Sequence, residues 1–302
     1  VYDALLREGV IVRPVGVYGF PEHVRITIGL PAENQRLVDT LTRVHRGHVE
    51  NIPYENLDVQ FERKVSRDPR AIFDKLVTRR RGGWCYEMNG LLDWALGEIG
   101  FKVTRMAGGV MRAVRGDDAL GNHLVLWVHL DRPYMADVGF GDGLVEPVPI
   151  MAGQIKQKFL TFQLEDMSDG WWRFHNSPGG GAPSFDFRLA QAPEAMLDEK
   201  CAWLQSDPLS PFVQNAVVQR HLPNSLAMMR GRSLKTVGQD EGTREIAGMA
   251  RYGEREAVSL ILSEIYSAAT HFHLRLPELF CGFEREPGEP PIAYPVACMP
   301  QA

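Results

Sequence analysis

The sequence lacks the segments that anchor a chain in a membrane or export it. None of its apolar runs approaches the roughly 20 consecutive residues that a membrane-spanning helix needs. The opening VYDALLREGV has neither the basic start nor the apolar stretch of a secretion signal. We therefore expect a cytoplasmic protein.

A strong excess of one charge is also missing. The 33 Lys and Arg residues nearly balance the 38 Asp and Glu residues, and the formal net charge is -5 at pH 7. A chain with this balance has no general attraction to nucleic acid or to an anionic membrane. We expect neither among its partners, and any polyanion must be bound locally. Whether the chain forms a homo-oligomer stays open.

Cysteines are few and scattered. The four of them form no C-x-x-C pair and no His/Cys cluster with zinc-ligand spacing, so we expect no metal. In a chain without a secretion signal they are expected to be free thiols, and a free cysteine is by default a small buried hydrophobic residue. The four are Cys85, Cys201, Cys281 and Cys298.

The first third of the chain has the spacing of helices. Apolar residues recur at helical intervals over 33–48, 69–80 and 85–99, and Gly100 closes the last segment. With 302 residues the chain exceeds a usual domain of roughly 100 to 200 residues, so two or three units are expected.

Beyond residue 100 the pattern changes to a period of two or to short apolar runs, which predicts strands. Turn signals at 131–133 and 168–170 join neighbouring strands, so the middle of the chain is expected to form an antiparallel sheet or small barrel. From about residue 208, a short strand at 225–229 precedes a helix at 254–268. The expected middle strands are 101–111, 123–130, 134–140, 158–164 and 171–175.

Only Cys85 has surroundings that favour chemistry. It follows Gly82 and Gly83 and begins the third predicted helix. Unpaired amides and the helix dipole stabilise a thiolate at such a position, and glycines let a substrate approach the backbone. A buried, inert cysteine explains the same residues, and this local pattern leaves the two interpretations evenly matched.

A thiolate nucleophile also needs a base, and the base needs an orienting group. His123 begins a predicted strand, and Asp137 lies in an otherwise apolar strand, where an unpaired carboxylate is costly. A simple hairpin at 131–133 would set residue 123 opposite about 141, with Asp137 some ~13 Å away along the strand. Spacing therefore does not bring the pair together, and a core histidine with a turn-capping aspartate remains an alternative.

Four further segments stand out: HVENIPYENLDV at 48–59, RRGGWCYEMNG at 80–90, NHLVL at 122–126 and DVGFG at 137–141. These four motifs resemble those of the arylamine N-acetyltransferases. They occur in the family's order, and the segment QSDPLSPF at 205–212 is similar to a fifth, weaker motif. One departure is Tyr54, which stands where the family more often has phenylalanine and adds a hydroxyl to the expected acceptor pocket.

The resemblance implies a catalytic triad of Cys85, His123 and Asp137. It implies transfer of an acetyl group from acetyl-coenzyme A, through a cysteine thioester, to an arylamine, arylhydrazine or hydrazide. Two alternatives use similar residues: an amide synthase that closes or releases a polyketide chain, and a cysteine hydrolase. The implied binding residues are Tyr54, Phe140, Gly141 and Phe212.

The resemblance also implies an α+β fold. A helical domain at 1–100 would carry the nucleophile, and an antiparallel, β-barrel-like domain at 101–207 would carry the histidine and the aspartate. An α/β lid at 208–302 would complete a core like that of the cysteine proteases.

Overall fold

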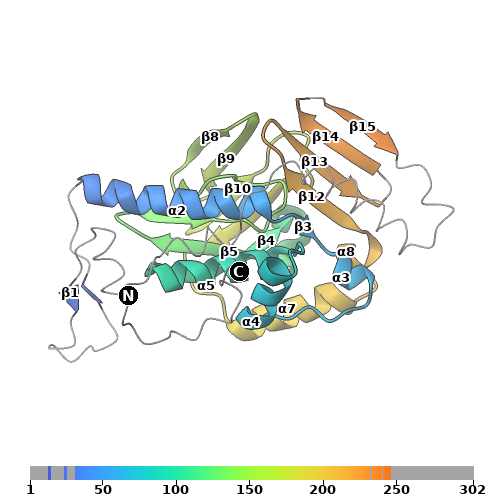
Figure 1. Ribbon diagram of the computed structural model, residues 1–302, viewed down its shortest axis with the longest axis horizontal. Coiled ribbons are helices and arrows are strands. Elements are labelled where there is room, and N and C mark those ends of the chain that lie inside the picture. The colour runs from blue at the N-terminus through green and yellow to red at the C-terminus, as the bar shows by residue number, and fades with distance from the viewer. Residues whose placement is uncertain (1–12, 15–23, 26–30, 232, 240, 246–302) are drawn as a thin grey trace, which may run out of the picture.

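The computed structural model describes residues 13–14, 24–25, 31–231, 233–239 and 241–245 (Figure 1). A two-stranded pairing of β1, Arg13–Pro14, with β2, Val24–Arg25, precedes the main body. The helix expected at 254–268 lies outside the described residues. Within them, no helix combines the length and apolarity needed to cross a membrane.

The three predicted helices are confirmed, with one irregularity. The first is α2, Pro31–Asn51. The second begins as α4, Pro69–Phe73, where the Asp68 carboxylate accepts from two backbone N–H groups, and it widens into a π-helical turn over Asp74–Thr78. The third, α5, runs over Cys85–Ile99 and ends at Gly100, whose φ of 110° favours glycine. A single turn, α3, lies at Leu57–Gln60.

The middle of the chain forms an eight-stranded sheet in which every pairing is antiparallel. Its spatial order is β7-β6-β5-β4-β11-β10-β9-β8. A short helix α6, Arg112–Arg115, and a 3-10 turn at Gly116–Ala119 connect β4 to β5. The strands are β4 Lys102–Val110, β5 Leu120–His129, β6 Pro133–Ala136, β7 Val148–Pro149, β8 Gly153–Gln157, β9 Leu160–Asp166, β10 Trp171–His175 and β11 Ser184–Arg188.

This sheet has to curl. Its two edge strands, β7 and β8, follow each other in the chain, and the step from Pro149 to Gly153 can span at most about 14 Å. Eight flat strands would separate these edges by about 34 Å. The short connection therefore bends the sheet into a half-barrel, in agreement with the predicted barrel-like middle region.

The two faces of β5 show how the sheet joins the helices. Leu126 and Val128 point to one face and are buried with Leu41 of α2 and Leu91 of α5. Val125 points to the other face and is buried inside the curl, among phenylalanines from β9, β10 and β11. The helices thus cover the outer face of the curled sheet, where α2 and α5 lie beside β5 in Figure 1.

A second sheet of five strands has the order β15-β14-β13-β12-β3. Its strand β3, Tyr54–Glu55, comes from the first motif and pairs with β12, so a segment near the beginning of the chain joins the last described sheet. The other strands are β12 Val217–His221, β13 Ser225–Arg230, β14 Ser233–Gly238 and β15 Gly242–Glu245.

Two helices link the sheets. Helix α7, Glu194–Ser206, was not expected from the sequence, although Leu197, Cys201 and Leu204 are buried at helical spacing. It is followed by the short α8, Pro211–Gln214, where the Ser210 side chain accepts a hydrogen bond from the N–H of Phe212.

Candidate active site

Cys85 is the first residue of α5, as the sequence indicates. The Glu87 carboxylate turns back and accepts from the N–H of Trp84 at 3.3 Å, which caps the helix. A side chain at Gly82 would collide with the Pro53 carbonyl and the Glu55 side chain, so the approach to the helix requires glycine there. A side chain at Gly83 would likewise meet the Glu87 side chain, so both glycines of the motif serve close packing around the start of α5.

A buried ionic network lies beside this helix start. Lys75 binds Glu87 and Asp58, each at 2.8 Å. Arg81 binds Glu55 at 3.0 Å and Asp58 at 3.3 Å. Glu55 and Asp58 are thus engaged in structural ion pairs.

His123 and Asp137 are brought together. Their Nε2 and Oδ2 atoms lie 2.7 Å apart, and each residue is about 2 % exposed. The other carboxylate oxygen of Asp137 accepts from Asn89 Nδ2 at 2.8 Å and from the N–H of Gly139 at 2.9 Å. Burial works to raise the pKa of Asp137, but His123 and these donors outweigh it and lower the pKa.

The expected hairpin register was wrong by two residues. His129 pairs with Pro133, so residues 130–132 form the turn, and β6 ends at Ala136 before the predicted strand does. Continued by one residue, this register sets Asp137 opposite Val125. His123 lies two residues before Val125 on the same face of β5, so Asp137 is a diagonal neighbour of His123. Diagonal neighbours are about 7 to 8 Å apart, which two side chains can bridge.

The imidazole of His123 is fixed on several sides. Because a carboxylate accepts at Nε2, that nitrogen carries a proton and leaves Nδ1 as the nitrogen that can exchange one. The rings of Phe140 and Phe185 pack edge-on against the imidazole, with centroid distances of 5.3 and 4.9 Å. The ring is therefore oriented before any substrate binds.

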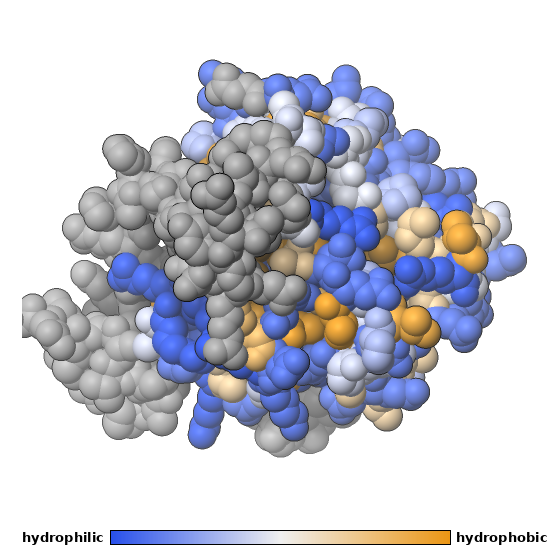
Figure 2. All heavy atoms as spheres, turned by 90° about the vertical axis from the view of Figure 1, so that its right-hand side faces the viewer, coloured by the Kyte–Doolittle hydropathy of each residue, from blue (hydrophilic) through white to orange (hydrophobic). Residues whose placement is uncertain are grey.

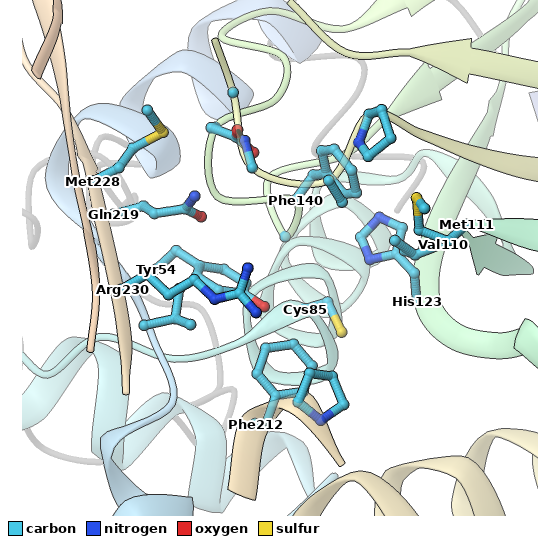
Figure 3. A pocket seen from close by; sticks show the side chains of 18 of the residues that line it. Tyr54, Cys85, Val110, Met111, His123, Phe140, Phe212, Gln219, Met228 and Arg230 are labelled. Atoms are coloured by element: carbon cyan, nitrogen blue, oxygen red, sulfur yellow. Dashed lines mark hydrogen bonds between the residues drawn. The ribbon is translucent and has the colours of Figure 1, made fainter. Parts of the chain in front are cut away.

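Cys85 and His123 line one cavity of about 630 Å³ (Figure 3). Three of the four predicted binding residues, Tyr54, Phe140 and Phe212, line it as well. Gly141 is not among the lining residues. It passes closely behind Tyr54 and Gln219 with a φ of +82°, so a side chain there would be both strained and in collision.

The thiol of Cys85 is buried, and burial raises its pKa above the ordinary value. Hydrogen bonds with the backbone of Leu124 and Tyr86 lower it, but by less. Burial thus opposes the effect of the N-terminus of α5, which on its own would lower the pKa of the thiol and favour a thiolate. A thiolate at neutral pH then requires a nearby cation, and the imidazole that shares the cavity can supply it.

Basic residues of the cavity were missed by the sequence reasoning. Arg115, Arg230 and Lys235 line it together. Arg230 and Lys235 come from the neighbouring strands β13 and β14, whereas Arg115 lies more than 100 residues earlier, in α6. Lys235 also donates to the Gly179 carbonyl at 2.6 Å, which ties the glycine-rich loop at 179–181 to the second sheet. The meeting of these basic residues in one cavity could not be predicted from local sequence, because it depends on the packing of the two sheets.

The glycine-rich loop forms part of the cavity wall. Gly179, Gly180 and Gly181 all line the cavity. The buried carboxylate of Asp142 accepts from the N–H of Gly181 and from Asn176 Nδ2 at 3.0 Å. The loop is therefore anchored to the segment that follows Phe140.

Apolar side chains gather in the middle of the face shown in Figure 2, among polar ones. This is the side on which α3, α8 and the second sheet lie in Figure 1. Helix α8 contributes Phe212 to the cavity, where its ring packs edge-on against Trp84 at 5.3 Å.

Among the described residues, no cluster of three or more His, Cys, Asp or Glu is placed to hold a metal ion.

Comparisons with known proteins agree with these motifs. The family model for N-acetyltransferases matches residues 37–267. The arylamine N-acetyltransferase of Mycolicibacterium smegmatis is 34% identical over 216 residues, which cover 68% of this chain and 78% of the relative. A Salmonella typhimurium relative, named arylamine N-acetyltransferase / N-hydroxyarylamine O-acetyltransferase, is 33% identical over 62% of this chain and 68% of its own.

Solved structures give the same answer. The Mycobacterium marinum arylamine N-acetyltransferase in complex with CoA superposes with a TM-score of 0.67 at 27% identity, covering 76% of this chain and 86% of that one. The M. smegmatis enzyme gives a TM-score of 0.66 at 30% identity, over 75% and 84% of the two chains. The chain therefore belongs to the arylamine N-acetyltransferase family of acyltransferases.

Proposed function

We propose that this protein transfers an acetyl group from acetyl-coenzyme A to an arylamine, arylhydrazine or hydrazide by a ping-pong mechanism through Cys85. The observation that carries the proposal is the paired His123 and Asp137 in the cavity that also holds Cys85. Relatives named arylamine N-acetyltransferase, and one solved with CoA bound, support the choice of donor and acceptor.

In the first half-reaction His123 takes the thiol proton, and the resulting ion pair offsets the burial of Cys85. The thiolate attacks the thioester carbonyl, and a new C–S bond forms. Backbone N–H groups at the start of α5 stabilise the oxyanion. The bond to the coenzyme A sulfur then breaks, and the leaving thiolate takes the proton from His123.

In the second half-reaction the acceptor amine attacks the acetyl-cysteine. His123 removes the proton that the amine loses as its C–N bond forms, and the Cys85–acetyl bond breaks. The products are the acetylated amine and a thiolate beside an imidazolium. Asp137 stays ionised, holds the Nε2–H tautomer and stabilises the cationic ring.

The cavity suits a donor that carries phosphates. Arg115, Arg230 and Lys235 gather positive charge on its wall, although the whole chain is acidic. Charge-assisted hydrogen bonds from such groups hold phosphate oxygens. The apolar side chains of Tyr54, Phe140 and Phe212 would then receive the aromatic acceptor.

We also propose three domains: a helical one at 1–100, a β-rich one at 101–207 and a lid at 208–302. In this division Cys85 comes from the first domain, and His123 and Asp137 from the second. The antiparallel sheet formed by β12 to β15 belongs to the third and supplies Met228 and Arg230 to the cavity.

Intact-mass analysis tests the proposal. Incubation with acetyl-coenzyme A should add one acetyl group, and a later addition of 4-methylaniline should remove it and yield the acetanilide. Loss of the acetyl group in buffer alone, at the same rate as with the amine, would mean a hydrolase. A protein that is never acetylated by acetyl-coenzyme A would refute the donor and leave the amide synthase as the candidate.

A further inference from the structure

A second histidine stands behind the candidate site. His45, on α2, is fully buried. Its Nε2 accepts a hydrogen bond from the N–H of Asp137 at 3.1 Å, and its Nδ1 lies 3.0 Å from the Val145 carbonyl. Asp137 is the residue just after β6, so its N–H is satisfied by this side chain and not by a strand partner in the eight-stranded sheet.

These two contacts define the state of the ring. A carbonyl can only accept, so Nδ1 carries the proton, and Nε2 must be bare to accept from an N–H group. His45 is therefore the neutral Nδ1–H tautomer. Burial lowers its pKa to about 4, which is consistent with a ring that stays neutral in ordinary buffers.

The side chain of His45 links two points of the loop between β6 and β7. Asp137 begins the irregular segment 137–147 between β6 and β7, Val145 lies near its end, and one imidazole joins the two residues. Between these two residues the segment carries Phe140, which lines the cavity and packs against His123. Another buried histidine, His221 of β12, hydrogen-bonds with the backbone of Gly141 in the middle of the same segment.

We propose that His45 is a positioning residue of the reaction, which fixes the backbone of Asp137 and thereby the carboxylate that orients His123. This inference rests on the function proposed above and adds a residue to it. His45 touches neither substrate nor reacting atom and acts only through Asp137. An error of about 1 Å in such a group can lower a rate about 100-fold.

The requirement is for one donor and one acceptor at a fixed spacing. Glutamine carries both in its side-chain amide and can replace each contact. Asparagine is shorter: it can donate to Val145 in place of Nδ1 but cannot reach the N–H of Asp137. Leucine makes neither bond and leaves two buried backbone groups unpaired.

His48 offers a matched control on the same helix. It is also buried, three residues further along α2, and among the described residues neither of its ring nitrogens has a hydrogen-bond partner. Replacing it by leucine removes a buried imidazole from α2 without touching the bond to Asp137.

The test measures single-turnover acetylation of Cys85 by acetyl-coenzyme A in four variants whose folding is checked by thermal unfolding. We expect His45→Leu and His45→Asn to slow acetylation about 10- to 100-fold, with the KM for acetyl-coenzyme A changed less than about threefold. His45→Gln should recover most of the rate, and His48→Leu should stay near wild type. If His45→Leu does not fold, the comparison of asparagine with glutamine decides.

Equal losses in the His45 and His48 variants, or asparagine and glutamine variants of equal rate, would overturn the positioning role. Alkylation of Cys85 by iodoacetamide separates this outcome from failure of the proposed function, because it needs no coenzyme A. A wild type that is never acetylated refutes the donor, and the alkylation rates still test His45. They should fall in the asparagine variant and recover with glutamine if His45 positions the pair.

Discussion

Asn89 donates from Nδ2 to Asp137 Oδ1 at 2.8 Å, on the carboxylate oxygen that His123 does not use. Asn89 lies four residues after Cys85 in α5, so both side chains emerge from the same face of one helix. Its Oδ1 also accepts from the N–H of Val138 at 2.9 Å. The helix that carries the proposed nucleophile therefore also holds the end of β6.

Replacement of Asn89 by alanine should damage both stability and rate. It leaves the Val138 N–H and the Leu124 carbonyl without this partner, which costs about 1 to 3 kcal/mol for a buried group. Asp137 loses one of its donors, so we expect acetylation to slow about tenfold. Chemical denaturation and single-turnover acetylation measure the two effects. An unchanged acetylation rate in a folded variant would contradict the role of this bond.

Replacement of Cys85 by alanine should abolish acetylation and leave the fold largely intact. Cys201 is the matched control, because it is also buried and carries a free thiol but is not among the residues that line the cavity. Wild type and Cys201→Ala should each gain one acetyl group by intact mass, and Cys85→Ala none. An acetylated Cys85→Ala protein would show that the nucleophile is elsewhere.

Tyr54→Phe should alter the choice of acceptor more than the use of donor. Tyr54 lines the cavity, and burial raises the pKa of its phenol, so the hydroxyl stays neutral and polar. Removal of the hydroxyl should change the relative rates of para-substituted anilines severalfold, with little change in Cys85 acetylation. Rates for both half-reactions, measured separately, provide the check. Equal effects on the two would assign Tyr54 a shared structural role.

The sequence alone could predict much of the fold near Cys85, since α5 and its closing Gly100 follow from helical spacing and glycine conformation. It could not predict the His123–Asp137 contact without the resemblance. That contact depends on whether the turn centres on residue 131 or 132, and either choice fits the turn signal at 131–133. The diagonal approach of the two side chains follows only from the observed register of β5 and β6.

Helix α7 was missed for a different reason. Its buried residues Leu197, Cys201 and Leu204 have helical spacing. Four further apolar residues that are not buried blur this one-sided pattern: Ala195, Met196, Ala202 and Trp203. The contacts of His45 were also missed, because a histidine in a helical segment does not indicate which backbone groups it will contact in the folded protein. Long-range contacts such as His45 with Asp137 arise from packing between α2 and the end of β6.

Acid should destabilise the protein through its buried histidines. Burial lowers the pKa of His45 and His221 to about 4 and that of His48 to about 3, against 6.5 when exposed. Nearby Asp137 and Glu146 raise the pKa of His45, but by less. Because the unfolded chain binds these protons first, the free energy of unfolding is highest above pH 6.5 and falls as the pH drops toward 4.

Each of His45 and His221 should account for a loss on the order of 3 kcal/mol across that window. Urea unfolding from pH 7 to pH 4 measures the decline, and His48→Leu should make it shallower by removing one of the three groups. A free energy of unfolding that stays constant over this range would contradict the assignment of these histidines as neutral in the folded protein.

Asp137→Asn should weaken the thiolate of Cys85. The substitution removes the negative charge that favours imidazolium and lets the amide bond His123 in a different tautomer. Since burial raises the pKa of the Cys85 thiol, the thiolate depends on that imidazolium more than on the helix start. Wild-type Cys85 should therefore react with iodoacetamide well below the free-thiol value of about 8.5, and the variant should need a higher pH. Peptide mass spectrometry at Cys85 gives the pH profile of each protein, with Asp186→Asn as a control for loss of a buried carboxylate that binds arginines and not His123. Coincident profiles for wild type and Asp137→Asn would mean that Asp137 does not orient His123, and the proposed triad would be wrong.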